Sequence, residues 1–423
     1  MSVASRPVVA ILLCGLLGLH AAAASVTISK PEDAGFSSER LRIIEPLIKS
    51  HIASRDLSGA VTLVARRGRV VQFEAFGSTD FDAHRPMRTD TLFRLASMTK
   101  PMTAVAVLML MEEGKLILSD PVSKFIPEFK NPKVAVWNLP NDPRGAGVRL
   151  ITADREVTLQ HILTHTAGLA VGTEGPAGES YRQANLSARI SLGEFSKRVG
   201  ALPLNFQPGT QWEYTSTVGF SVLGRVVELV SGMNLDQFFR QRMFDPLGMS
   251  NTFFNVPQNR LSDVATVYAL TAEGPVKQNP PAPLPAGVEF YSGSGGLTGT
   301  AEDYLQFCQM LLNGGEWHGA RLLSRKSVEL MTDNAIGDLD LANYPVPGQD
   351  LRGYGFGLGV RVRKSTGASG WLGSVGDYGW AGANGTYFWI DPKEQLIGMV
   401  MMATRVGRLR TEFPNAVYQA IID

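Results

Sequence analysis

The chain has 423 residues, of which 44% are hydrophobic and 19% are charged. These proportions are typical of a globular protein with a large core, and they exclude an intrinsically disordered chain. Because 40 Lys and Arg residues are balanced by 39 Asp and Glu residues, the formal net charge is only +1. Such an equal number of acidic and basic residues gives no sign of the basic surface that nucleic-acid binding requires. We therefore expect no nucleic-acid partner.

Residues 1–24 have the pattern of a secretory signal peptide. Arg6 gives a positive start, Val8 to Leu19 form an apolar core, and Ala22-Ala23-Ala24 forms a small-residue cleavage site. Since the apolar core is too short to span a bilayer, we expect a secreted or periplasmic protein without stable membrane association. Cleavage would leave Cys308 as the only cysteine, so no intramolecular disulfide is expected.

The N-terminal part predicts a helix followed by a β-hairpin. Apolar residues at helical spacing predict the helix over 36–53. The apolar runs 59–65 and 70–76 flank the turn Arg66-Arg67-Gly68-Arg69, which predicts two antiparallel strands. An antiparallel sheet with a helix on one face is the expected result.

The middle of the chain is predicted to be mostly helical, with irregular segments between the helices. The helices are expected at 102–113, 120–125, 157–165, 220–231 and 235–244. Pro- and Gly-rich stretches predict irregular structure at 131–148, 171–182 and 275–285.

The C-terminal part returns to strand patterns after a helix that Thr300 is expected to cap. Strands are expected at 354–363, 385–390 and 396–402, and a helix at 411–422.

These elements predict an α+β fold in which both ends of the chain complete one antiparallel sheet. An α/β domain would consist of residues 25–92 and 288–423, and residues 93–287 would form an inserted, mostly helical domain. A ligand cleft is expected where the two domains meet.

Ser97 and Lys100 form a Ser-x-x-Lys pattern directly before an apolar helix. Residues three apart are neighbours on a helix, so the lysine amine can lie beside the serine hydroxyl. A serine hydroxyl is a poor nucleophile until a base takes its proton. A lysine whose pKa is lowered by burial or by a nearby cation can be that base. The pattern is short and matches many surface residues by chance, so its surroundings must decide.

Further sequence blocks accompany this pattern in a fixed order. They are Phe93–Lys100, Glu112–Leu116, Asp120–Val122, Leu163–Leu169, Pro208–Ser216 and Trp380–Gly385. Together they resemble the serine β-lactamase and penicillin-binding protein superfamily over residues 36–422. The chain is most similar to the family VIII carboxylesterases, which are related to class C β-lactamases. The resemblance implies a β-lactamase-like fold.

The resemblance also implies a role for each matching residue. Ser97 is the nucleophile that becomes acylated, Lys100 is its general base, and Tyr214 matches the tyrosine of the Tyr-x-Asn motif. A phenol beside a lysine ammonium is expected to lose its proton more easily, so Tyr214 could activate water or protonate the leaving alcohol. The N–H groups of Ser97 and Ala383 are the candidate oxyanion donors, and Gly382 would allow close approach to the substrate.

Two positions depart from the β-lactamase pattern and concern the substrate. Ser216 stands where the Tyr-x-Asn motif has its asparagine, and Trp380-Ala381-Gly382 replaces the Lys-Thr-Gly block. The missing lysine removes a charge-assisted partner for a substrate carboxylate. Since Trp380 offers an apolar face and one N–H, neutral esters are the expected substrates, with Trp380, Gly382 and Ser216 among the substrate-binding residues.

The predicted function is hydrolysis of short-chain carboxylic esters through an acyl-enzyme on Ser97, with a small-molecule ester as the substrate. β-Lactam hydrolysis stays open as a side activity, because the acylation chemistry is shared. The first alternative is a class C-like β-lactamase or a D-amino-acid peptidase. The second is a non-catalytic penicillin-recognising or peptidoglycan-binding protein, which would not need Ser97, Lys100 and Tyr214 together. The sequence does not predict the oligomeric state.

A metal or cofactor is not expected. His161 and His165 have the spacing of a helical zinc pair, but Ile162 stands where a metalloprotease has its glutamate. A zinc site also needs a third protein ligand, and the sequence shows no candidate.

Overall fold

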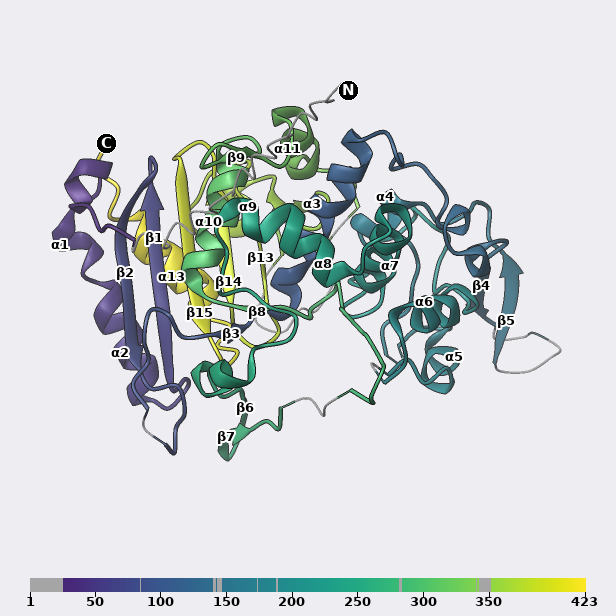
Figure 1. Cartoon of the computed structure of the whole chain (residues 1–423), viewed down its shortest axis with the longest axis horizontal. Coiled ribbons are helices and arrows are strands. Elements are labelled where there is room, and N and C mark those ends of the chain that lie inside the picture. Colours follow the sequence, from purple (N-terminus) through teal and green to yellow (C-terminus); the bar gives the residue numbers. More distant parts are fainter. Residues whose placement is uncertain are drawn as a thin grey trace, which may run out of the picture.

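The N-terminal hairpin and the C-terminal strands form one seven-stranded antiparallel sheet, in the order β11-β12-β13-β14-β15-β1-β2 (Figure 1). The junction between the two ends is the pairing of β1 with β15, in which Ala60 lies opposite Met402. The bounds of these strands are β1 (Gly59–Arg66), β2 (Arg69–Gly77), β11 (Tyr354–Phe356), β12 (Arg361–Arg363), β13 (Tyr378–Ala381), β14 (Tyr387–Asp391) and β15 (Leu396–Met402).

The computed structural model describes residues 26–83, 85–139, 142, 147–172, 174–187, 189–280, 284–339, 341 and 351–423. The predicted signal peptide lies outside these residues. Among the helices that are described, none is both long and apolar enough to cross a membrane.

Helices cover both faces of the sheet. On one face lie α1 (Ser38–Leu41), α2 (Ile44–Ala53) and α13 (Leu409–Tyr418), and on the other lies α10 (Ala301–Leu312) (Figure 1). Strand β1 shows why both faces need cover, since it is buried along its whole length. Its side chains alternate between two apolar clusters, with Val64 beside Ile48 and Phe413 in one, and Val61 and Leu63 in the other.

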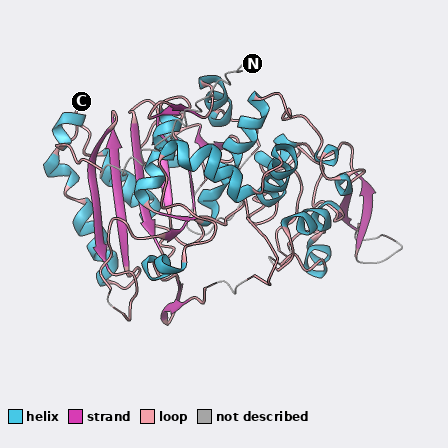
Figure 2. Cartoon of the chain, viewed as in Figure 1, coloured by secondary structure: helices cyan, strands magenta, loops and turns pink. Residues whose placement is uncertain are grey.

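Helix α3 (Thr99–Glu112) connects the sheet to the helical part of the molecule. Its residues from Thr99 to Leu110 are all buried, as expected for a helix that is apolar on every side. It packs against α7 (Gly219–Ser231). Figure 2 shows helices both over the sheet and beyond it. The helices beyond the sheet include α4 (Leu159–Leu163), α5 (Gly178–Gln183), α6 (Leu192–Gly200) and α8 (Leu235–Phe239), while α9 (Asp245–Leu247) lies against α10.

The short elements complete the chain. The two-residue strands β3 (Phe93–Arg94) and β8 (Thr298–Gly299) pair with each other just before the Ser-x-x-Lys pattern. The remaining elements are β6 (Tyr268–Thr271), β7 (Gly274–Lys277), β9 (Glu316–Trp317), β10 (Ala320–Arg321), α11 (Arg325–Thr332) and α12 (Thr366–Ser369).

The predicted α+β class is confirmed, while several segments differ from expectation. The predicted loop at 131–148 contains β4 (Lys133–Trp137), which pairs with β5 (Val148–Thr152). Its prolines flank the strand rather than interrupt it, so the turn signals outweighed the short apolar run Val134–Trp137. The predicted loop at 171–182 ends in α5, where Tyr181 is buried. The predicted irregular stretch at 275–285 begins within the hairpin β6–β7, although residues 281–283 lie outside the described residues.

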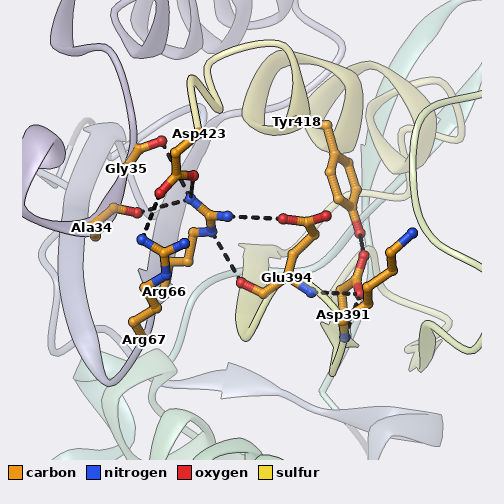
Figure 3. A network of polar contacts seen from close by, with 9 residues as sticks. Ala34, Gly35, Arg66, Arg67, Asp391, Glu394, Tyr418 and Asp423 are labelled. Carbon is orange, nitrogen blue, oxygen red and sulfur yellow. Dashed lines mark hydrogen bonds and ion pairs between the residues drawn. The ribbon is translucent and has the colours of Figure 1, made fainter.

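A network of ion pairs lies at one end of the paired strands β1 and β15 (Figure 3). The Arg66 guanidinium, whose side chain is only 3% exposed, lies 2.8 Å from Glu394 Oε2 and 2.6 Å from Asp423 Oδ1. It also donates to the carbonyl oxygens of Ala34 and Gly35. This buried cation thus has carboxylate partners and holds the N-terminal segment, the β14–β15 turn and the C-terminal residue together.

Candidate active site

Ser97 lies on a 3₁₀ turn, Ala96–Met98, which leads directly into α3. The preceding residue, Ala96, has a φ of 45°, a left-handed conformation that a residue with a Cβ rarely adopts. Hydrogen bonds fix the turn on both sides, because Leu95 N–H donates to Leu297 O and Met98 N–H donates to Leu95 O. Strained backbone of this kind occurs where the surroundings hold a residue for a purpose, so this turn is a candidate site on geometric grounds.

Lys100, in the first turn of α3, is completely buried. Its Nζ lies 3.0 Å from Ser97 Oγ, 2.5 Å from Ser216 O and 2.8 Å from Ser294 O. Among the described residues it has no carboxylate partner. Burial therefore lowers the pKa of Lys100 well below its usual value, because desolvation disfavours the ammonium more than these neutral acceptors stabilise it.

These contacts define the direction of the hydrogen bonds to Lys100. The carbonyl oxygens of Ser216 and Ser294 can only accept, so a neutral amine donates its two protons to them. Its lone pair then faces the third partner, Ser97 Oγ, at 3.0 Å, where a neutral amine can accept the Ser97 proton. This is the arrangement that a general base needs before it takes a proton.

Tyr214 lies on the other side of Ser97. Its ring centroid is 4.9 Å from Lys100 Nζ, its hydroxyl hydrogen-bonds to the Ser97 side chain, and Trp380 Nε1–H donates to its oxygen at 3.2 Å. Burial raises the pKa of Tyr214 to about 12, although the bonds to Ser97 and Trp380 act in the opposite direction. The expectation of an easily lost phenol proton is therefore wrong for this resting site, because burial disfavours the phenolate.

Trp380 is buried, at 1% exposure, and its ring centroid lies 5.2 Å from that of Tyr214. Its single N–H is directed at the phenol oxygen, so this group holds Tyr214 in place in the resting site. The half-buried Ser216 contributes its backbone carbonyl to Lys100. The sequence placed both residues near the substrate but gave no sign of these contacts.

Gly382 and Ala383 begin the turn between β13 and β14. A Cβ on Gly382 would lie 2.4 Å from the Leu95 carbonyl oxygen and 2.1 Å from Thr386 Oγ1, so only glycine fits. The close approach is thus to the backbone beside Ser97. It brings the exposed Ala383 next to the turn that carries Ser97.

His165 packs against the Tyr214 ring and binds the residues on either side of it. Its Nδ1 accepts the Thr215 N–H at 3.2 Å and lies 2.9 Å from Thr215 Oγ1, while its carbonyl accepts the Glu213 N–H at 3.0 Å. It therefore holds both neighbours of Tyr214, and its ring packs 4.7 Å from the tyrosine ring. The sequence predicted only that this histidine ends a helix. Its place in the block Leu163–Leu169 was the one signal that it lies near the site.

The two histidines use their Nδ1 atoms in backbone hydrogen bonds within the protein. His161 Nδ1 accepts the Thr158 N–H at 3.2 Å and so caps α4, while Nδ1 of His165 is used by Thr215. Within the part of the chain that the structure describes, no group of three or more His, Cys, Asp or Glu side chains could hold a metal ion.

Ser97, Lys100 and Tyr214 thus lie together where the antiparallel sheet meets the helical region. The Beta-lactamase family model matches residues 44–422. The chain belongs to the Beta-lactamase family, and its β-lactamase-like fold is thereby confirmed.

Individual relatives are consistent with this assignment. Protein Rv1367c of Mycobacterium tuberculosis is 37% identical over 72% of this chain and 75% of its own length. Esterase EstB of Burkholderia gladioli is 34% identical over 62% of this chain and 68% of its own length. Among solved structures, EstCE1, described as a hydrolase with promiscuous acyltransferase activity, is 25% identical with a TM-score of 0.75, covering 91% of this chain and 99% of its own.

Proposed function

We propose that the protein hydrolyses short-chain carboxylic esters through an acyl-enzyme on Ser97. The observation that carries this proposal is the set of contacts at Lys100 Nζ, which prepares a buried neutral amine to take the Ser97 proton. The esterase EstB and the hydrolase EstCE1 support an ester as substrate. The preference for short acyl chains comes from the resemblance to family VIII carboxylesterases.

In the acylation step, Lys100 takes the proton as Ser97 Oγ attacks the ester carbonyl carbon. The ammonium that forms keeps two carbonyl partners, and it faces the ring of Tyr214 at 4.9 Å, which favours a cation. The N–H groups of Ser97 and Ala383 would hold the oxyanion of the tetrahedral intermediate.

Tyr214 would act as the acid in the same step. Since its pKa is about 12, it carries a proton at neutral pH and donates that proton to the departing alkoxide, whose own pKa is higher. The Lys100 ammonium then returns a proton to the phenolate, so the amine is neutral again before water attacks the acyl-enzyme. Deacylation would use the same groups in reverse.

Neutral esters fit this site better than β-lactams or D-amino-acid peptides, which carry a carboxylate. The position of the lysine in the Lys-Thr-Gly block is taken by Trp380, whose one N–H is bound to Tyr214. A substrate carboxylate therefore finds no charge-assisted partner at this position. β-Lactam hydrolysis is proposed only as a slow side activity.

The test compares wild type with Ser97→Ala on a short-chain nitrophenyl ester, a chromogenic cephalosporin and a D-Ala-D-Ala peptide. Ser250→Ala, at an exposed serine, is the matched control. We expect ester turnover by wild type and control, and a loss of at least about 10³-fold in Ser97→Ala. Ester turnover that survives in Ser97→Ala contradicts the nucleophile. A cephalosporin rate far above the ester rate identifies a β-lactamase, and turnover of no substrate favours a binding protein.

Export and the domain division complete the proposal. We propose that residues 1–24 are removed on secretion or transfer to the periplasm, and that the inserted helical domain at 93–287 supplies the Ser-x-x-Lys helix and Tyr214. N-terminal sequencing of the exported protein tests the first point, since it should begin at Ser25.

A further inference from the structure

Arg410 is a buried cation beside the turn that carries Ala383. It lies in the first turn of α13 and is 4% exposed, and its Nη2 donates to the Gly382 carbonyl oxygen at 2.7 Å. Tyr214 is close enough to interact with it electrostatically. No motif in the sequence singled out this residue.

The surroundings of Arg410 work against its charge. Its buried Nε has no hydrogen-bond partner among the described residues, and no carboxylate in that part of the chain pairs with it. Arg361 and Arg405 repel it, and the N-terminal end of a helix disfavours a cation. Burial, with Arg361, lowers the pKa of Arg410 to about 10, so it is nevertheless charged at neutral pH.

A second buried arginine shows what a stabilising arrangement looks like. Arg363 is equally buried, and its Nε lies 2.6 Å from Asp377 Oδ2, while further N–H groups reach Ser369 and the Trp371 carbonyl. Arg410 lacks any such set of partners. Stability alone therefore does not account for a charged group at position 410.

The hydrogen bond to Gly382 has a direct consequence for the neighbouring N–H. The Gly382 carbonyl and the Ala383 N–H belong to the same peptide group, so a cation on the oxygen draws electrons away from the nitrogen. The N–H becomes a stronger donor, and its direction is fixed. Fixed donors aimed at developing negative charge are a major source of catalysis in acyl transfer.

We propose that Arg410 is a positioning residue that strengthens the Ala383 N–H as an oxyanion donor by binding the carbonyl of the Gly382–Ala383 peptide. This inference rests on the proposed acyl-enzyme function. It assigns to Arg410 a contribution that appears in the transition state, where the oxyanion exists, and not in the binding of the neutral ester.

The test replaces Arg410 by Met and by Lys and measures kcat, KM and the affinity for an alkylboronic acid, which forms a tetrahedral anion on the nucleophile. For Arg410→Met we expect kcat to fall about 10- to 100-fold, with KM within about threefold of wild type. Boronate affinity should fall by the same factor as kcat/KM. Arg410→Lys keeps the charge and should recover part of both losses.

Val417→Ala is the matched control, because it removes buried volume from the same helix without touching Gly382. It should lower the thermal unfolding temperature and leave kcat and boronate affinity unchanged. If it lowers both as much as Arg410→Met does, the effect is structural and the inference is wrong.

A loss in Arg410→Met that appears in KM alone would mean that Arg410 binds the substrate, and a change below twofold would mean that it does neither; both results overturn the inference. If Arg410→Met does not fold, the Ala383 amide proton resonance decides in Arg410→Lys. A shift to lower frequency supports a polarised peptide, and an unchanged resonance contradicts it. Failure of the proposed function is distinct, because wild type would then show no Ser97-dependent ester turnover.

Discussion

Arg66 and Lys100 are both almost completely buried, but their partners differ in kind. Arg66 lies against the carboxylates of Glu394 and Asp423, whereas Lys100 Nζ meets one hydroxyl and two backbone carbonyls. A carboxylate keeps a buried cation charged and ties chain segments together. The carbonyls around Lys100 are neutral acceptors, and burial lowers the pKa of its amine, which prepares it to act as a base. Since arginine side chains stay charged in proteins, the residue type and the partners together separate a structural cation from a chemical one.

The largest effect is expected from Lys100→Met, which keeps the volume and removes the base. We expect kcat/KM for the ester to fall about 10²- to 10⁴-fold, the range of general-base catalysis. The free energy of unfolding should change by only about 1 kcal/mol, because the lost hydrogen bonds are offset by removing the cost of burying an amine. Ester kinetics and urea unfolding measure the two quantities.

Arg66→Met tests whether Arg66 contributes to stability and not to catalysis. Loss of the guanidinium should lower the free energy of unfolding by about 1–3 kcal/mol, because buried carbonyls and carboxylates lose their donor. Ester kcat/KM should remain within about twofold of wild type. A loss of activity as large as that of Lys100→Met would show that the two cations do not have separate roles.

The next loss of activity is expected when the proposed general acid, Tyr214, is replaced. Tyr214→Phe removes the proton that we assign to the leaving alkoxide, and kcat should fall about 10²-fold or more for an alkyl ester. The loss should be smaller for a nitrophenyl ester, whose leaving group needs no proton. Equal losses on the two esters would contradict the acid role, and circular dichroism checks that the variant is folded.

The pH dependence of kcat/KM tests the protonation state of Lys100. Below the lowered pKa of Lys100 the amine is protonated and cannot act as a base, so kcat/KM should fall as the pH falls through that value. Because burial lowers this pKa, the fall should lie well below the usual range of a lysine. A profile that rises only near the ordinary lysine pKa would mean that the amine is charged at rest.

The smallest effect is expected from Trp380→Phe, which keeps an apolar ring but removes the N–H that is 3.2 Å from Tyr214 Oη. We expect kcat to fall about threefold to tenfold, because one neutral hydrogen bond contributes about 1 kcal/mol. Cephalosporin turnover should not increase, because no charge is added. A gain in cephalosporin turnover would mean that Trp380 acts by excluding that substrate.

The sequence predicted the parts of the fold that depend on local pattern. The β1–β2 hairpin, the strand at 396–402 and the Thr300-capped helix α10 follow from periodicity and turn residues within short windows. The hairpin β4–β5 was missed because prolines and glycines around Lys133–Trp137 outweighed a short strand pattern.

The candidate site could be predicted only in its residue types. Ser97, Lys100 and Tyr214 were recognised from ordered blocks, but the protonation state of Tyr214 depends on burial, which no local pattern contains. Arg410 could not be found at all, since an arginine at the start of a helix is ordinarily a surface residue. Its significance lies in a contact with Gly382, 28 residues away in the chain.

The proposed mechanism requires that Lys100 is a neutral amine in the resting enzyme. Carbon-13 NMR of protein labelled at the lysine Cε, with Lys100→Met to assign the resonance, measures its pKa directly. We expect the Lys100 resonance to titrate well below the ordinary lysine value of about 10.4. A Lys100 resonance that titrates at or above the ordinary value would contradict it.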